Sequence, residues 1–151
     1  MATSTANSAA PAFTGEFRHK IEGKNRVTIP APWRFGEETE LFMIIRSVKR
    51  CIAVMTREEV ERHKAVATAA MNAESRARVL DLFGRKLRQV TLDKAGRISI
   101  PDELCKELGL ERELWLSGAV DTFNIWNVSD FEAEKARERA AENDFLRQLG
   151  I

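Results

Sequence analysis

The chain has 151 residues and a formal net charge of +1, and 44% of its residues are hydrophobic and 31% charged. This composition is typical of a globular protein the size of one ordinary domain, and it excludes a chain that is disordered throughout. No run of 18 apolar residues occurs, and residues 1–12 lack the basic start and apolar centre of a signal peptide. We therefore expect a cytoplasmic protein with no membrane partner.

The chain is expected to begin with a mobile arm, followed by a strand, a turn and a second strand. Residues 1–12 are rich in Ala, Ser, Thr and Pro and offer too little apolar surface to pack. Residues 17–21 alternate apolar with polar or basic side chains, and residues 27–29 resume the alternation, which predicts two strands. Gly23 and Asn25 both tolerate positive φ and predict a tight turn between them.

Proline and glycine mark two short helices. Pro30 can begin the first, which Gly36 can end. Pro101 begins the second, and Gly109 stands just past its end. Leu110 is expected to fold back on this helix, as residues after a helix-ending glycine commonly do.

Residues 57–83 contain almost only helix-forming residues, with neither proline nor glycine, so they predict one helix or a pair of helices that Gly84 ends. Two side-chain pairs have the spacing of a capping box and predict the starts of this helix and of the last helix. These pairs are Thr56 with Glu59 and Ser129 with Glu132.

The sequence repeats itself after 71 residues. This shift places Arg26 on Arg97 and Pro30 on Pro101, and it matches apolar class over about 40 positions with no insertion. The predicted hairpins are residues 41–46 with 51–55 and residues 114–117 with 122–126. Matched apolar pairs are Met43 with Leu114, Ile45 with Leu116, Ile52 with Phe123, Val54 with Ile125, and Val60 with Phe131.

We interpret this repeat as a duplicated unit. One copy of about 45 residues is near the lower limit for independent folding, so the two copies are expected to share a core. The fold prediction is α+β: a pseudo-twofold, barrel-like protomer with short helices, in which apolar strands of one copy cover those of the other.

Charge is uneven along the chain. The segment from Arg76 to Arg97 holds seven basic and two acidic residues, whereas six acidic and four basic residues follow Ser129. We expect one basic face and an acidic C-terminal tail.

Each copy holds a carboxylate and an arginine four residues apart, Glu22 with Arg26 and Asp93 with Arg97. The two groups can pair across the turn and brace it. Alternatively, the turns present the arginines to phosphate or to a guanine edge, because the planar guanidinium donates two parallel hydrogen bonds to either. The two interpretations are compatible.

Other chemistry finds little support in the sequence. His19 and His63 have no metal ligand at a suitable spacing, and Cys51 and Cys105 lie in apolar patterns without a catalytic partner. No glycine-rich phosphate loop occurs. We expect no enzyme, metal, cofactor or small-molecule substrate, and we expect the three tryptophans to be core or interface residues rather than base-stacking platforms.

The duplicated carboxylate-x-x-x-Arg turn, each followed by Val/Ile-x-Ile-Pro, closely resembles the MraZ family of bacterial proteins, which contain two SpoVT/AbrB-like domains. Residues 123–126, Phe-Asn-Ile-Trp, close the second copy in the same way. The resemblance runs from about Phe13 to Phe131. The first copy departs from the family pattern, since Glu22 replaces the usual Asp and Asn25 the usual Gly.

The resemblance implies a transcriptional regulator that binds direct repeats in the promoter of the division and cell-wall gene cluster. It also implies that identical subunits assemble into a ring and that the protein is associated with the nucleoid. We divide the chain into SpoVT/AbrB-like domains 16–61 and 88–132, a helical connection 62–86 and a C-terminal helix and tail 133–151. The arm 1–12 is longer than the family needs and inherits nothing from it. The candidate DNA-binding residues are Glu22, Lys24, Arg26, Asp93, Lys94 and Arg97, with Arg18, Lys20 and Arg88 as phosphate contacts.

Repeating a few cationic contacts around a ring would raise affinity for repeated DNA sites, which supports self-assembly on physical grounds. The alternative is a ring-forming protein-interaction module without a DNA target, which would bind partners through Trp33 and the acidic tail. Salt separates the two, because phosphate binding weakens sharply with salt and an apolar interface does not.

Overall fold

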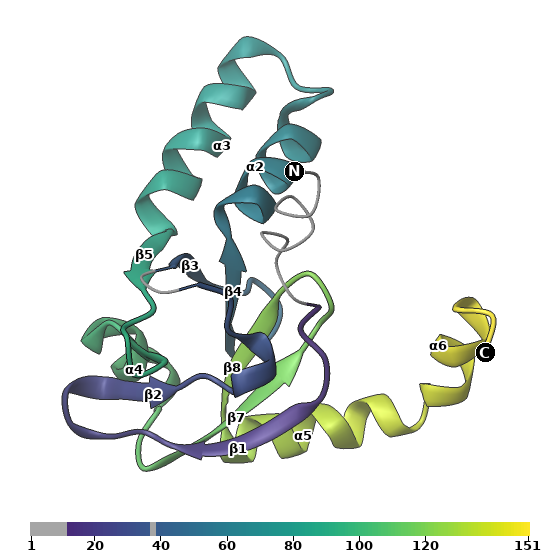
Figure 1. Cartoon of the computed structure of the whole chain (residues 1–151). Coiled ribbons are helices and arrows are strands. Elements are labelled where there is room, and N and C mark those ends of the chain that lie inside the picture. The colour runs from purple at the N-terminus through teal and green to yellow at the C-terminus, as the bar shows by residue number, and fades with distance from the viewer. Residues whose placement is uncertain (1–11, 37–38) are drawn as a thin grey trace, which may run out of the picture.

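The computed structural model describes residues 12–36 and 39–151, so almost all of the predicted arm lies outside the described residues. Within them it contains eight strands and five α-helices (Figure 1). The strands are β1 (Glu16–Lys20), β2 (Arg26–Thr28), β3 (Glu40–Ile45), β4 (Cys51–Thr56), β5 (Arg88–Thr91), β6 (Arg97–Ser99), β7 (Glu113–Gly118) and β8 (Phe123–Asn127). The helices are α2 (Arg57–Thr68), α3 (Ala73–Lys86), α4 (Asp102–Leu108), α5 (Val128–Arg139) and α6 (Glu142–Gln148). The α+β class is confirmed.

Six strands form one antiparallel sheet in the order β1-β7-β8-β4-β3-β5. At its centre β4 pairs with β8, and Ala53 faces Asn124, the residue 71 positions later. Strands from the two halves are thus hydrogen-bonded neighbours in one sheet, whereas we had expected the strands of one copy to cover those of the other. Among the described residues the sheets do not close into a barrel, so the barrel-like arrangement is not confirmed.

The remaining two strands form a separate ribbon. β2 pairs with β6 and places Val27 opposite Ile98. Both side chains are buried, and they join Ile29 and Ile100 in the main core between the ribbon and one face of the sheet. The alternation of apolar and polar residues in these strands explains this arrangement, since every second side chain points to the core.

Helices α2 and α5 pack on the sheet through separate apolar clusters. They begin and end 71 residues apart, as the repeat predicts. Val60 of α2 packs in a cluster with Phe42 and Met55, and Phe131 of α5 packs between Trp115 and Trp126. The repeat therefore extends from strands to helices.

The pairing of β3 and β7 corrects the predicted repeat. Leu41 faces Thr56, and Leu114 faces Asn127, which lies 71 positions after Thr56. Leu41, not Met43, is therefore the equivalent of Leu114, and the local shift is two residues larger than predicted. The second copy has two more residues before β7 and two fewer in the β7–β8 hairpin.

The predicted helix signals are partly confirmed. The Thr56 side chain accepts a hydrogen bond from the Glu59 N–H and caps α2. Gly109 ends α4 at φ 64°, and the Leu110 N–H donates back to the Cys105 carbonyl at 2.9 Å, as expected.

Two helix boundaries differ from the prediction. The side chain of Asn127, not Ser129, caps α5, because its oxygen accepts the N–H groups of Ser129 and Asp130. Gly84 does not end the helical segment, since α3 continues to Lys86. A single glycine inside a helix costs only about 1 kcal/mol, which the remaining turns offset.

Candidate nucleic-acid interface

The first turn joins β1 to β2. Glu22 and Arg26 exchange two backbone hydrogen bonds, of 2.8 and 3.1 Å, and the chain reverses between them. Lys24 and Asn25 adopt left-handed conformations, with φ of 64° and 57°, so Asn25 uses the tolerance for positive φ that we expected of it, and Gly23 does not. Among the described residues no ion pair joins Glu22 to Arg26; the Arg26 Nε donates to the Gly23 carbonyl at 3.2 Å.

The second turn is braced by its carboxylate. One oxygen of Asp93 accepts the N–H groups of Ala95 and Arg97 at 2.9 Å each, and the other accepts the Arg97 Nε at 3.1 Å. The backbone hydrogen bond from Arg97, followed by the hydrogen bond and positive charge of its guanidinium, lowers the pKa of the Asp93 carboxyl. The predicted brace thus exists in the second motif and not in the first.

The two arginines lie diagonally across the ribbon. Arg26 faces Ser99, and Arg97 faces Thr28. Diagonal neighbours on one face of an antiparallel pair have Cα atoms roughly 7–8 Å apart. Since Val27 and Ile98 occupy the core face, both arginines extend from the opposite, outer face, where they are partly exposed.

Each turn is also held by the strand of the other copy. The Ile29 N–H donates to the Gly96 carbonyl at 2.8 Å, and the Ile100 N–H donates to the Asn25 carbonyl at 2.9 Å. These two bonds are equivalent under the 71-residue shift. The orientation of each turn therefore depends on both halves of the chain.

Arg34 is a neighbour of this site that the sequence analysis did not identify. Its Nε donates to the Ile29 carbonyl at 2.8 Å. A Cβ atom placed on Gly96 would lie 2.5–2.7 Å from three atoms of the Arg34 side chain. The positive charge of Arg34 also lowers the pKa of His19, after the larger effect of burial. No repeat signal marks Arg34, because the residue 71 positions later is Cys105.

The other side chains predicted to contact DNA differ in whether they are exposed or already form an ion pair. Lys24 and Lys94 are exposed at the two turns, and Lys20 is exposed at the end of β1. Arg18 forms an ion pair with Glu113 at 2.5 Å, on the β1 edge of the sheet. Arg88 pairs with Glu103 at 2.6 Å on the β5 edge, so the structure does not bring Arg18 and Arg88 together.

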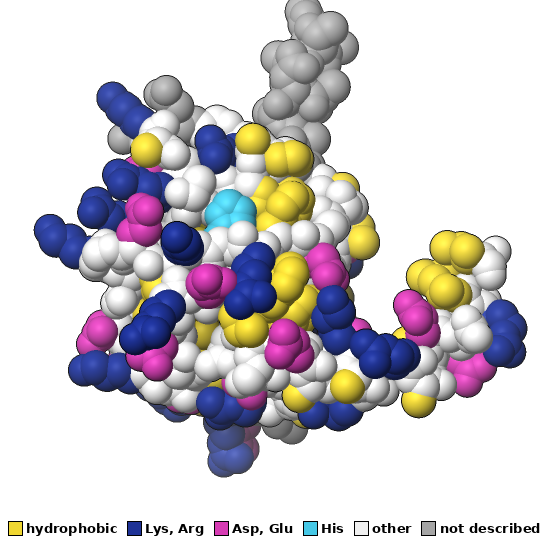
Figure 2. Space-filling model, turned by 90° about the horizontal axis from the view of Figure 1, so that it is seen from below, with side chains coloured by type: hydrophobic (Ala, Val, Ile, Leu, Met, Phe, Trp, Pro, Cys, Tyr) yellow, Lys and Arg dark blue, Asp and Glu magenta, His cyan; other side chains and the backbone are white. Residues whose placement is uncertain are grey.

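Charge on the side that carries β1 and β2 is mixed. Figure 2 shows Lys and Arg side chains with Asp and Glu side chains among them. Part of the acidic tail is neutralised within the chain: Lys49 pairs with Glu134 at 3.1 Å, and Arg50 with Asp130 at 3.2 Å.

Trp33 cannot serve as the partner-binding residue of the alternative hypothesis. It is 2% exposed, packs against Phe13, Phe17 and Phe123, and donates its indole N–H to the Thr14 carbonyl at 2.9 Å. Trp33 is therefore a core residue.

Both cysteines are buried. Burial raises the pKa of each cysteine thiol, Cys51 and Cys105, to about 11, which disfavours a reactive thiolate. In the part of the chain that the structure describes, no group of three or more His, Cys, Asp or Glu side chains is arranged to hold a metal ion. No helix there is long and apolar enough to cross a membrane.

Residues 85–148 match a family model described as "MraZ protein, putative antitoxin-like". This segment of the chain is therefore similar to the MraZ family. It includes the Asp93–Arg97 motif, the ribbon strand β6 and the helices α4 and α5.

Proposed function

We propose that the protein is a sequence-specific DNA-binding transcriptional regulator whose β2–β6 ribbon contacts DNA. The observation that carries this proposal is the pair of arginines, Arg26 and Arg97, on the outer face of a two-stranded ribbon whose core face is anchored by Val27 and Ile98. The family match to an antitoxin-like protein agrees with a regulatory role.

The ribbon has a shape that DNA can accommodate. The major groove of B-DNA admits a two-stranded β-ribbon, and an arginine can donate two hydrogen bonds to a guanine edge there. Lys24 and Lys94 lie at the two turns, where they can reach phosphates on either side. Asp93 fixes the backbone next to Arg97, which limits the entropy that Arg97 loses on binding.

We further propose that residues 16–61 and 88–132 are two SpoVT/AbrB-like units and that several copies of the chain form a ring on direct repeats in a promoter. The regulated genes would be those of the division and cell-wall cluster, and the protein would be associated with the nucleoid. Support comes from the 71-residue equivalence of β4 with β8 and of α2 with α5. A ring would repeat the arginine pair and raise its avidity for repeated DNA sites.

The test is a fluorescence-anisotropy titration of the protein against its own upstream DNA and a scrambled duplex, each at two salt concentrations. Specific binding that weakens as salt rises is expected, because each phosphate contact releases counterions. Equal, weak binding to both duplexes would refute the regulator and leave the interaction module without a DNA target.

Single variants then locate the interface. Arg97→Ala should weaken binding to the upstream DNA by about 1–3 kcal/mol if Arg97 reads a base. Arg78→Ala is the matched control, because Arg78 is an exposed arginine of α3 whose one ion pair among the described residues is with Glu74, in its own helix. An Arg97→Ala protein that is folded and assembled and binds as tightly as the control would exclude Arg97 from the interface.

A further inference from the structure

We propose that α6 of one chain docks in an apolar groove beside α3 of a second copy. We call this cavity the α3 groove. The proposal deepens the proposed self-assembly, on which it rests, by naming the two surfaces that meet.

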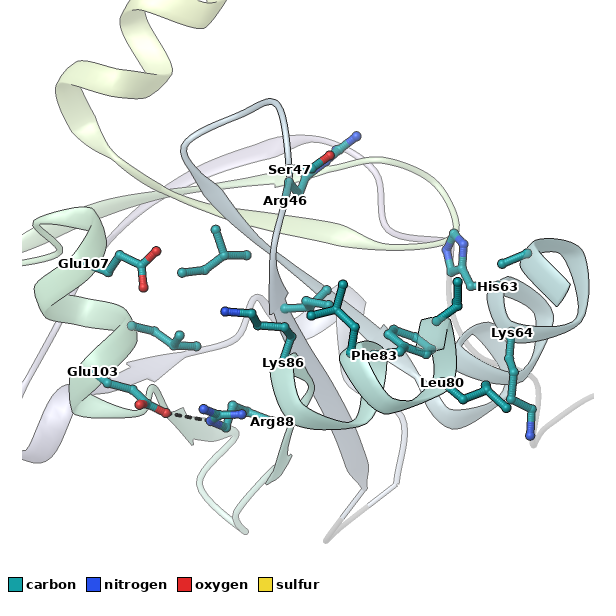
Figure 3. Close-up of a pocket in the computed structure, with 16 residues that line it drawn as sticks. Arg46, Ser47, His63, Lys64, Leu80, Phe83, Lys86, Arg88, Glu103 and Glu107 are labelled. Carbon is teal, nitrogen blue, oxygen red and sulfur yellow. Dashed lines mark hydrogen bonds and ion pairs between the residues drawn. The ribbon is translucent and has the colours of Figure 1, made fainter. Parts of the chain in front are cut away.

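The α3 groove has a volume of about 660 Å³ and lies between α2, α3, α4 and the end of β3 (Figure 3). Its apolar lining includes Ile44, Ile45, Val79, Leu82, Phe83 and Leu104. Leu82 remains 50% exposed, so the described residues of the chain leave this lining accessible. A groove of this volume with an apolar lining is typical of a binding site.

The segment proposed to fill it is the last helix of the chain. α6 extends away from the body of the molecule in both Figure 1 and Figure 2, and hydrophobic side chains are visible at its tip. None of its residues is buried. Its exposed apolar side chains are Phe145 and Leu146, and two more follow the helix, Leu149 at its C-cap and Ile151. Leu149 is 73% exposed, so α6 and its C-cap present an apolar face that is not covered by the described residues of the same chain.

The two surfaces match in chemistry as well as in exposure. Phe145, Leu146 and Leu149 have the i, i+1, i+4 spacing of one helix face, which is the pattern of a helix that binds in a groove. Among the described residues three charged residues that line the groove, Arg46, Lys86 and Glu107, form no ion pair, and neither does Glu142 in the first turn of α6. These groove residues carry two positive charges and one negative charge, and the positive excess favours contact with Glu142.

A second copy is the occupant, not the helix of the same chain. In Figure 1 α6 stands at the end of α5, on the far side of the molecule from α2 and α3. One copy thus offers a groove and a helix on two different surfaces. Such a head-to-tail contact builds rings when its rotation closes, whereas a twofold contact stops at a dimer.

Two variants, each disabling one surface, test this contact by light scattering coupled to size-exclusion chromatography over a range of concentrations. Leu149→Glu places a charge on the apolar face of α6, and Leu82→Glu places one in the groove. The matched controls are Gln148→Glu on the polar face of α6 and Ala77→Glu on an exposed face of α3 outside the groove. Wild type and both controls should form the same assembly, and each test variant should reduce it to the 17.1 kDa of one chain.

Mixing the two test variants gives the decisive result. The Leu149→Glu chain keeps an intact groove, and the Leu82→Glu chain keeps an intact α6, so one contact remains possible per pair. The mixture should therefore have twice the mass of one chain and grow no further. Circular dichroism of each variant before mixing shows that it is folded, and a variant that is unfolded is replaced by Leu149→Ser or Leu82→Ser.

Three outcomes would overturn the docking proposal: a wild-type protein that is a monomer at every concentration, folded test variants that assemble as the controls do, or a mixture that stays monomeric. The DNA titration distinguishes failure of the docking proposal from failure of the proposed DNA-binding function. A wild-type protein that assembles as expected but does not prefer its upstream DNA would refute the regulator and leave the docking intact.

Discussion

Replacing Gly96 by alanine should destabilise the second turn through two separable effects. Gly96 has φ of 80°, and a left-handed conformation costs a residue with a Cβ atom about 1 kcal/mol. The added Cβ atom would also lie 2.5 Å from the Arg34 Cζ, so the Arg34 side chain must leave its place. The guanidinium group of Arg34 can move into solvent. It then loses its hydrogen bond to the Ile29 carbonyl, which is worth about 1 kcal/mol.

A double-mutant cycle measures the two effects by urea unfolding. Gly96→Ala should lower the free energy of unfolding by about 2 kcal/mol in the wild-type background. It should lower it by only about 1 kcal/mol in an Arg34→Ala background, where the side chain to be displaced is absent. Gly23→Ala is the matched control, because Gly23 lies in the first turn with no atom near its added Cβ and without positive φ.

If Gly96→Ala lowers the free energy of unfolding equally in both backgrounds, Arg34 makes no contact at Gly96 that affects stability, which would refute the second effect. The same variants should be tested for DNA affinity. If the turn positions Arg97, the Gly96→Ala protein should bind the upstream DNA more weakly than the Gly23→Ala protein does.

Further predictions concern the fold and its response to pH. Gly118→Ala should lower stability by about 1–3 kcal/mol, because its Cβ atom would lie 2.2 Å from the Phe13 carbonyl oxygen; a neutral result in denaturant unfolding would contradict that contact. Gly84→Ala should raise stability by up to about 1 kcal/mol in the same assay, since it lies within α3 with no atom near the added Cβ, and a loss would show an unrecognised contact. Phe131→Ala should cost about 3–5 kcal/mol and alter tryptophan fluorescence, because Phe131 packs between two tryptophans; a loss below 1 kcal/mol would contradict its role in packing. The pKa of the Asp93 carboxyl, measured by NMR, should lie below its usual value of 3.8, so its stabilising effect is full above that value and is lost as pH falls through the lowered pKa. An Asp93 pKa at or above 3.8 would show that the brace is absent in solution.

The sequence predicted the strands and most helix boundaries because their signals are local. Alternating apolar residues define one face of a strand. Gly109 can end α4 by its own conformation, independently of how the rest of the chain folds. The cap of α5 was missed because Asn127 and Ser129 are both good capping residues two positions apart. The choice between them depends on where β8 ends, which is a property of the sheet.

Arg34 was missed for a related reason. Its contacts with Gly96 and with the Ile29 carbonyl depend on how the two halves of the chain come together. A single arginine with no equivalent in the other copy carries no pattern from which that contact could be inferred. The arginines of the two turns were identified only because each occurs at the same place in a repeated motif.

The error in the repeat has a geometric cause. The shift of β3 relative to β7 differs by two residues from that of the other strands, and a strand displaced by two residues keeps every side chain on its original face. Apolar positions therefore still match apolar positions, and the hydrophobic pattern cannot reveal the displacement. A displacement by one residue would have reversed the faces and been evident in the sequence. The two extra residues lie before β7, where the second copy builds α4, and the groove beside α3 is lined in part by that helix. At the place equivalent to α4 the first copy has a short 3₁₀ helix, Ala31–Trp33, so the two halves differ there in local structure as well as in length.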